Sequence, residues 1–312
     1  MRFSPANVPK PFGARLPGPA ERAVLAMTSA LPDSWLGLRL AMALRRPALN
    51  CLARHGREAA LDVRRWGVKL RLHPLDNGCE KNLLFTPQMY EPAELSVLAR
   101  DVALARSDAR PYTFIDIGAN VGLFSLFVAS RTGPMARILA VEPEPGNLAR
   151  LTFNVASNPG LPIRPIAAAL GREEGEVVIA LNRRDRGGSR AYRVTDPKPD
   201  SQGVRVPCRP LLTLLRVQGI TSVDALKIDV QGMEDEVMAP FFHEAPRALW
   251  PRMLLLANSD PEWRTDLFGI LARSGYVVTT LTKQNVILRL PDQPAMAMPS
   301  ETEMPSRVMA QR

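Results

Sequence analysis

Two glycines four residues apart follow an acid in the stretch FIDIGANVGLF, Phe114 to Phe124. Mostly apolar residues lead into Asp116, and a second apolar run follows Gly118 and Gly122. This order predicts a strand, a tight turn and the start of a helix. Glycine tolerates positive φ and has no side chain, so such a turn can bring bare backbone against a ligand. The stretch therefore predicts a ligand-binding loop.

A second acid, Glu142, stands in AVEPEPGN directly after the next strand-like run. An acid at that point can accept hydrogen bonds from both hydroxyls of a ribose. Alternatively it caps a helix, since Glu144 and Asn147 are close by. The glycine loop is GxxxG with Asn120 at its centre, which departs from the GxGxxG dinucleotide fingerprint. A free ribose leaves NAD and S-adenosylmethionine as ligands and argues against NADP.

A third motif, LKIDVQGMED, combines a lysine and an acid on one face of a core strand. Lys227 needs a partner there, and Asp229 is the natural one by spacing. Asp229 lies near the carboxyl end of its strand, beside the expected ligand, while Gly232 permits a sharp turn and Glu234 opens a helix. The pair is either functional or a purely structural ion pair at the edge of the sheet.

Strand-like and helix-like runs alternate from Tyr112 onward, which predicts an α/β fold with a mostly parallel sheet and helices on both faces. The predicted core strands are Thr113–Ile117, Ile138–Val141, Ile163–Ala167, Ala225–Val230 and Met253–Ala257. A closing hairpin, Tyr276–Leu281 and Val286–Leu290, makes the last strand antiparallel. Ligands of such sheets bind at the carboxyl ends of the strands.

The predicted organisation has four parts. Residues 1–20 form a flexible arm, and 21–110 form a helical and β extension with a half-exposed strand at Val68–Leu72 and a helix at Pro92–Leu104. Residues 111–290 form the ligand-binding domain, and 291–312 a disordered tail. Within the domain, 171–215 is an insertion with two strands and the basic loop RRDRGGSR. That loop is either a lid over a substrate or a solvated turn.

Charge and composition restrict the class of protein. Hydrophobic residues make up 46% of the 312, as in globular proteins. The net charge of +9 lies mostly in residues 1–110, which hold 17 Lys and Arg against 10 Asp and Glu. This predicts either a solvated arginine-rich surface or a patch for nucleic acid or an anionic membrane. No nucleic-acid-reading motif is present, and aromatics are only 6%.

Cysteine usage and hydropathy indicate a cytoplasmic protein. Cys51, Cys79 and Cys208 are scattered without a CxxC pair, which predicts a reducing compartment. The N-terminus lacks an apolar signal region, and the run AVLAMTSALP is far shorter than the roughly 20 residues of a membrane span. No HExxH motif or Cys/His cluster predicts a metal site, although acids from distant loops could converge on magnesium.

Taken in order, FIDIGANVGLFSLFVA, AVEPEPGNLARLTFNV, AAALG and LKIDVQGMEDEV resemble the FkbM family of S-adenosylmethionine-dependent methyltransferases. The resemblance covers about residues 85–290 and includes MYEPAELSVL. It implies a class I methyltransferase sheet, Rossmann-like, and O-methylation of a hydroxyl on a sugar, a glycan or a secondary metabolite. It also implies six cofactor positions: Asp116, Gly118, Asn120 and Gly122 around the methionine part, Glu142 at the ribose, and Ala168 near the adenine.

The same resemblance places Asp229 and Glu234 beside the methyl group and the acceptor. Methyl transfer to oxygen is an in-line displacement, which mainly requires alignment of the acceptor. We expect Asp229, paired with Lys227, to act as the base or to orient the acceptor, while His243 is expected at the surface. The chain departs from the family on the acceptor side, where Gln231 replaces an acid.

Three alternatives stay open at this stage. An NAD-dependent oxidoreductase would need the GxGxxG fingerprint, which is broken in this chain, and a Tyr-x-x-x-Lys pair, which is absent. A nucleic-acid methyltransferase fits the basic N-terminal third but lacks the Asn/Asp-Pro-Pro-Tyr motif. A binding module could keep the cofactor pocket without chemistry. The oligomeric state cannot be predicted.

Overall fold

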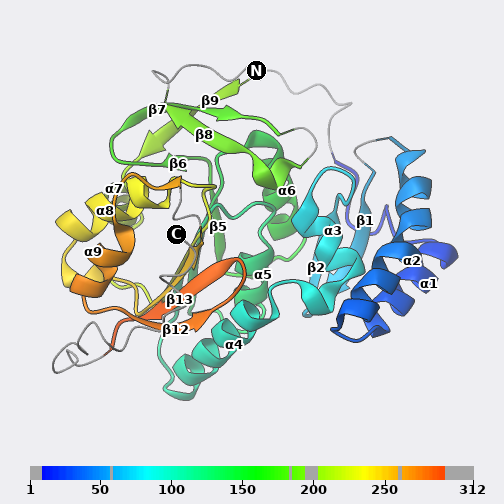
Figure 1. Cartoon of the computed structure of the whole chain (residues 1–312), viewed down its shortest axis with the longest axis horizontal. Helices are drawn as coiled ribbons and strands as arrows, with labels where there is room; N and C mark the ends of the chain where they lie inside the picture. The colour runs from blue at the N-terminus through cyan, green and yellow to red at the C-terminus, as the bar shows by residue number, and fades with distance from the viewer. Residues whose placement is uncertain (1–8, 57–58, 183–184, 194–202, 259–261, 292–312) are drawn as a thin grey trace.

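The computed structural model of the chain describes residues 9–56, 59–182, 185–193, 203–258 and 262–291. A seven-stranded sheet of order β12-β13-β11-β10-β3-β4-β5 forms its centre (Figure 1). The strands are β3 (Thr113–Ile117), β4 (Arg137–Val141), β5 (Ile163–Ile166), β10 (Ala225–Ile228), β11 (Met253–Ala257), β12 (Val277–Leu281) and β13 (Asn285–Arg289). β13 runs antiparallel to both of its neighbours, and the other pairings are parallel. The predicted α/β class with an antiparallel last strand is confirmed.

Helices cover both faces of this sheet because its central strands are apolar on both sides. Phe114 of β3 packs in one core with α4 (Pro92–Ser107), α5 (Leu123–Ala129) and α6 (Pro145–Ala156). Its neighbour Ile115 points to the opposite face, as successive strand residues do. There it packs with α7 (Leu211–Val217), α8 (Glu234–Glu244) and α9 (Leu267–Arg273). His243 lies exposed on α8, as predicted.

The N-terminal extension docks on α6 rather than standing apart. It contains α1 (Pro19–Ala30), α2 (Trp35–Ala53), a hairpin of β1 (Leu61–Arg65) and β2 (Val68–Leu72), and α3 (Gly78–Phe85). Asn154 of α6 and Asn158, just after that helix, accept backbone hydrogen bonds from Arg71 and Lys69 of β2, each at 2.8 Å. The sequence did not indicate β1 or α3.

The strand predicted at Val68–Leu72 is confirmed as β2, but it is not half-exposed, because Arg71 is buried. Its guanidinium pairs with Asp62 at 2.7 Å and donates to the backbone carbonyls of Lys10 and Pro11. Asp62 in turn accepts from the backbone N–H groups of Gly13 and Arg15. Fixed contacts therefore replace the flexible arm expected over this part of residues 1–20. Residues 1–8 and the predicted tail from 292 lie outside the described residues.

The predicted insertion forms a small sheet together with β6 (Ala169–Leu170), which directly precedes it. The order of this sheet is β6-β9-β7-β8, with bounds β7 (Gly175–Ala180), β8 (Arg190–Arg193) and β9 (Gly203–Arg209). The two strands predicted there agree with β7 and β9. The last residues of the predicted 171–215 insertion belong to α7, whose leucines lie in the core beneath the central sheet.

Candidate functional site

A pocket opens where three neighbouring strands end. The register pairs Ile117 of β3 with Val141 of β4 on one side and with Ile228 of β10 on the other. The chain leaves β3 toward β4 and returns to β10 on the opposite side, so strand order reverses between β3 and β10. Such a reversal opens a crevice at the carboxyl ends of the strands. Gly118, Asn120, Glu142, Ala168, Lys227 and Asp229 are among the lining residues.

Gly118 is required by the close approach of two motifs. Its φ is +74°, and a Cβ at this position would collide with the backbone carbonyl oxygen of Asp229. The backbone N–H of Asp229 donates to the carbonyl of Ile117 at 3.0 Å. The glycine loop and the LKIDVQG motif are therefore packed backbone to backbone, which no side chain would permit.

Glu142 is buried at the floor of the pocket and is held by two backbone donors. Its Oε2 accepts from the N–H of Asn120 at 2.7 Å, and its Oε1 accepts from the N–H of Glu144 at 2.9 Å. Asn120 reaches this position with a left-handed φ of 52°. The residue that caps α6 is Glu144 and not Glu142, because the Glu144 side chain accepts from the N–H of Asn147. Each oxygen of Glu142 keeps acceptor capacity for a further donor.

The protonation of Glu142 is set by its surroundings. Burial raises the pKa of this carboxyl to about 8, against the lowering effect of the Glu144 and Asn120 N–H groups; the nearby Glu144 and Asp116 charges raise it further. A ligand that donates two hydrogen bonds would stabilise the ionised form and lower this pKa. Binding of such a ligand is therefore coupled to release of a proton.

Lys227 and Asp229 form the predicted pair, with Nζ and Oδ2 3.9 Å apart. Burial alone would lower the pKa of Lys227, but the charges of Asp229, Asp116 and Glu91 outweigh it and raise this pKa. The ammonium also lies 5.0 Å from the ring centroid of Phe124. Asp229 keeps 36% of its side chain exposed. The pair thus presents a fixed cation and an accessible carboxylate to the pocket.

Glu91 lines the same pocket and was missed by sequence reasoning. Burial, with the charges of Glu94 and Asp229 adding to it, raises the pKa of its carboxyl to about 7, although Lys227 and a bond from Asn285 act in the opposite direction. An acid directly before Pro92 has the pattern of a helix cap. Its side chain makes no cap bond, and its backbone is left-handed with φ 44°. The strained backbone and the pocket position were the signals that only the fold revealed.

Two of the predicted cofactor-binding residues lie behind the pocket wall. Asp116 accepts from the backbone N–H and the hydroxyl of Ser125, the latter at 2.6 Å. Gly122 has φ +85°, and a Cβ there would meet Leu151. These residues shape the loop and the start of α5 and do not line the pocket.

Glu234 holds the turn after β10 in place. Its carboxylate accepts from the backbone N–H groups of Val230 and Gly232 and from the indole of Trp263 at 2.8 Å. It is fully buried and is not among the pocket-lining residues. Its position suits a residue that orients the Val230–Gly232 turn next to Asp229.

The insertion closes the remaining side of the pocket. Ile179 of β7 and the loop residues Arg186, Gly187 and Ser189 line it, as does Ala168. Asn147 of α6 also lines it, and its buried Oδ1 has no hydrogen-bond partner within the part of the chain that the structure describes. That oxygen offers a further acceptor for a polar ligand. Arg183 and Arg184 of the predicted basic loop lie outside the described residues.

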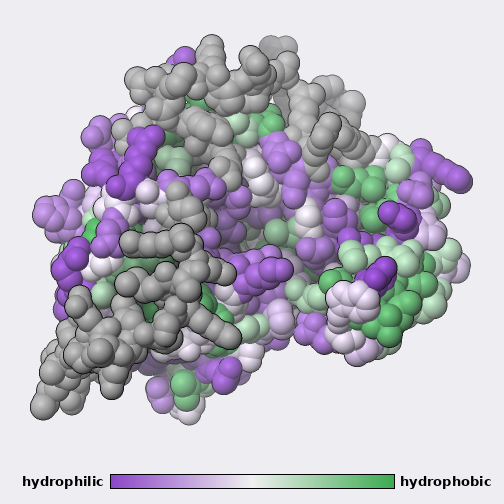
Figure 2. Space-filling model, in the orientation of Figure 1, coloured by the Kyte–Doolittle hydropathy of each residue, from purple (hydrophilic) through white to green (hydrophobic). Residues whose placement is uncertain are grey.

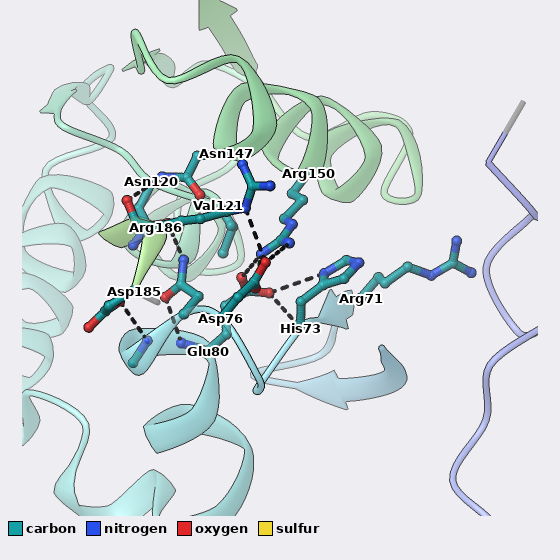
Figure 3. A network of polar contacts seen from close by, with 12 residues as sticks. Arg71, His73, Asp76, Glu80, Asn120, Val121, Asn147, Arg150, Asp185 and Arg186 are labelled. Atoms are coloured by element: carbon teal, nitrogen blue, oxygen red, sulfur yellow. Dashed lines mark hydrogen bonds and ion pairs between the residues drawn. The ribbon is translucent and has the colours of Figure 1, made fainter. Parts of the chain in front are cut away.

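A network of charges fastens this loop to the extension and to α6 (Figure 3). Arg186 donates to Asp76 and to Glu144, each at 3.0 Å. Arg150 of α6 pairs with Asp76 at 2.8 Å and with Glu80 at 2.9 Å. Because Glu144 also holds Glu142 through its backbone N–H, the network connects the insertion directly to the floor of the pocket.

The fold and the site together define a Rossmann-like α/β domain of the methyltransferase type. Residues 116–252 match the family model described as the methyltransferase FkbM domain. Over those residues the chain is similar to the FkbM methyltransferase domain, which confirms the predicted resemblance there. Among the described residues, no cluster of His, Cys, Asp and Glu suited to a metal ion occurs.

Two curated proteins are similar in sequence. Methyltransferase sdnD of Sordaria araneosa is 29% identical over 162 residues, which is 43% of this chain and 62% of that protein. AMB antimetabolite synthetase AmbE of Pseudomonas aeruginosa is 28% identical over 190 residues, which is 50% of this chain and 9% of that protein. The similarity thus spans less than two thirds of either relative.

Solved structures resemble the chain only loosely. A methyltransferase from Geobacter sulfurreducens gives a TM-score of 0.39 at 14% identity, covering 84% of this chain and 98% of that one. The SAM-dependent methyltransferase from Agrobacterium tumefaciens gives 0.39 at 11% identity, covering 75% and 70%. The assignment of the fold rests on the strand order of the chain itself.

Proposed function

We propose that this protein is an S-adenosylmethionine-dependent methyltransferase that methylates a hydroxyl oxygen of a sugar, a glycan or a secondary metabolite. The observation that carries the proposal is Glu142, a buried carboxylate after the second strand of an FkbM domain, held by backbone donors on both oxygens. A carboxylate in that setting is an acceptor for the two hydroxyls of an unmodified ribose.

The residues that line the pocket suit such a cofactor. The approach of Gly118 to Asp229 leaves bare backbone beside the pocket, where the methionine part would lie. Glu142 would hold the ribose, and Ala168 with the apolar Ile179 would flank the adenine. The unpartnered Oδ1 of Asn147 is a matching acceptor for a hydroxyl or amino group. We call Gly118, Asn120, Glu142 and Ala168 the cofactor half of the pocket.

The acceptor half consists of Glu91, Lys227 and Asp229. When bound, S-adenosylmethionine supplies an activated methyl group together with its own leaving group. The protein then has to orient the acceptor hydroxyl and take up its proton. Asp229 is accessible for both tasks, and its Oδ1 is oriented by the side-chain amide of Gln231 at 2.8 Å. Glu91, with a pKa of about 7, is the second carboxylate available to receive that proton.

Two observations favour the proposed class of acceptor. The acceptor half offers two carboxylates and one ammonium group, which suit a ligand with several hydroxyl groups. One relative is named as an antimetabolite synthetase, which favours a secondary metabolite, although only 9% of that protein is covered. The predicted O-methylation therefore remains a proposal to be tested with a panel of hydroxylated acceptors.

Calorimetric titration with S-adenosylhomocysteine, with NAD as the comparison ligand, tests the cofactor assignment. We expect binding of S-adenosylhomocysteine alone, weakened about 100-fold in Glu142→Ala, because two charge-assisted hydrogen bonds of about 1.5 kcal/mol or more each are lost. Glu173→Ala, an exposed acid outside the pocket, is the matched control and should bind as the wild type does.

Each outcome of the titration has a defined meaning. Absence of binding to either ligand would refute the cofactor assignment. Binding that Glu142→Ala leaves unchanged would remove Glu142 from the site. Tight binding without turnover of any acceptor in the panel would favour a cofactor-binding module over an enzyme.

A further inference from the structure

The hairpin of α1 and α2 carries a concentration of exposed apolar side chains. Twelve large hydrophobic residues are exposed in the part of the chain that the structure describes, and half of them fall within residues 16–42. They are Leu16, Met27, Trp35, Leu36, Leu40 and Met42, with exposed fractions of 40% to 69%. Figure 2 shows this hydrophobic area over α1 and α2 at the right of the view. Apolar surface gathered in one place marks an interaction site.

The exposed residues of α2 follow helical spacing, so they form a continuous face. Leu36, Leu40, Ala43 and Pro47 make one exposed row, and Trp35, Arg39, Met42 and Arg46 make the row beside it. The opposite side of the helix is buried at Gly37, Ala41, Ala48 and Leu52. One side of α2 is therefore buried, while the other presents a broad apolar face to its surroundings.

Basic residues are interleaved with this apolar face. Residues 9–56 hold seven lysines and arginines against two acids, a net charge of +5. The Arg39 guanidinium stacks over the Trp35 ring at 4.8 Å from its centroid. Tryptophan beside arginine on an apolar face suits the boundary between lipid headgroups and acyl chains, where the ring is partly buried and the cation meets phosphate.

The pattern discriminates between possible occupants. A second copy of the chain, docked face to face, would gather Arg39 and Arg46 of both copies within one apolar interface, which like charge disfavours. A nucleic acid would leave Leu36 and Leu40 without apolar partners. An anionic bilayer satisfies both the charges and the apolar rows. No described helix is long and apolar enough to cross a membrane, so the contact would be peripheral.

We propose that the α1–α2 face is a docking surface for an anionic phospholipid bilayer, with Trp35, Leu36 and Leu40 inserted at the interface and Arg39 and Arg46 on the headgroups. This inference does not depend on the proposed methyltransferase activity. Docking of this kind combines apolar burial with electrostatic attraction, so it should require anionic lipid and should weaken as salt screens the charges.

Co-sedimentation of the full chain with lipid vesicles tests the proposal. The vesicles are an equal mixture of phosphatidylcholine and phosphatidylglycerol, compared with pure phosphatidylcholine, at low and high salt. We expect at least a 10-fold preference for the anionic vesicles at low salt, largely lost at high salt. Leu36→Ser/Leu40→Ser should reduce binding at least 10-fold, and Arg39→Gln/Arg46→Gln should remove the preference for anionic lipid.

The control is Leu104→Ser/Leu281→Ser, which removes two equally exposed leucines elsewhere and should bind within about twofold of the wild type. Unchanged circular dichroism and thermal midpoint would show that the variants are folded. Absence of binding to anionic vesicles at low salt, or equal loss in the control, would overturn the proposal. A concentration-dependent dimer that Leu36→Ser/Leu40→Ser abolishes, without vesicle binding, would assign the face to self-association instead.

Discussion

The two halves of the pocket are built in different ways. The cofactor half is made by backbone: Gly118 packs against the Asp229 carbonyl, and Glu142 is held by two N–H groups. The acceptor half is made by side chains from the residue before α4 and from the end of β10, and Glu91 accepts a hydrogen bond from Asn285 of β13. Backbone geometry tolerates little change, whereas side chains can be replaced without altering the fold. Cofactor binding and acceptor chemistry can therefore be disrupted separately.

The largest effect is expected from Gly118→Ala, which attacks the cofactor half. The new Cβ would collide with the Asp229 carbonyl oxygen at a φ of +74°, so we expect destabilisation by at least about 2 kcal/mol and loss of S-adenosylhomocysteine binding. Thermal unfolding and calorimetry measure both. Gly133→Ala is the control, because a Cβ there meets nothing within 4 Å. A stable Gly118→Ala protein with normal affinity would show that the two motifs are not packed together.

Asp229→Asn is the corresponding change in the acceptor half. We expect turnover to fall by about 10² to 10⁴ while affinity for S-adenosylhomocysteine changes less than about threefold, because the carboxylate serves the acceptor and not the cofactor. Steady-state assays with an identified acceptor, combined with calorimetry, separate the two effects. Near-normal turnover would remove Asp229 from the mechanism.

The variant Glu91→Gln tests the second carboxylate of the acceptor half. If Glu91 receives the proton, its loss should lower turnover and abolish the limb of the pH–rate profile near pH 7, where its pKa of about 7 lies. A profile with an unchanged limb near pH 7 would assign Glu91 a structural role at the start of α4.

Cofactor affinity should depend on pH through Glu142. Its pKa of about 8 in the free protein means that the carboxyl is mostly neutral at pH 6.5, while ribose hydroxyls need a charged acceptor. We expect affinity for S-adenosylhomocysteine to rise about 30-fold from pH 6.5 to pH 9, with proton release on binding at the lower pH. Calorimetry in two buffers of different ionisation enthalpy measures that release. Glu142→Gln should bind weakly and show no such rise, and an identical rise would assign it to another group.

The same group affects the stability of the free protein in a defined direction. A carboxyl whose pKa is raised on folding stabilises the folded protein at pH values below the pKa that it has in the unfolded chain. That contribution is lost as the pH increases through the pKa that it has in the folded protein. For Glu142 the loss should extend from about pH 4.5 to about pH 8.

The smallest effect is expected from Arg186→Ala, which acts on the wall that the insertion provides. Removal of its bonds to Asp76 and Glu144 should weaken S-adenosylhomocysteine binding about 3- to 10-fold with little change in thermal midpoint, because Arg150 still pairs with Asp76. Arg205→Ala, which breaks an exposed pair with Glu176, is the control and should have no effect. Equal affinity in both variants would mean that the insertion does not close over the cofactor.

The central sheet, the glycine loop and the position of Glu142 could all be predicted from the sequence. These are local features: strand, turn and acid follow one another within a few residues, and glycine at positive φ is a property of the single residue. The Lys227–Asp229 pair was equally accessible, because alternate residues of a strand share a face.

The residues that reach the pocket from outside the predicted motifs are known only from the tertiary structure. Glu91 has the pattern of a helix cap, and its place beside Lys227 results from packing of α4 against the sheet. Glu234 and Asp116 appear in the motifs as site residues, yet backbone and hydroxyl donors bind their carboxylates behind the wall. The buried Arg71 reversed the expected exposure of β2, since Asp62, its cross-strand partner on β1, neutralises it. Long-range pairing of charges depends on contacts far apart in the chain, and residue spacing alone does not contain that information.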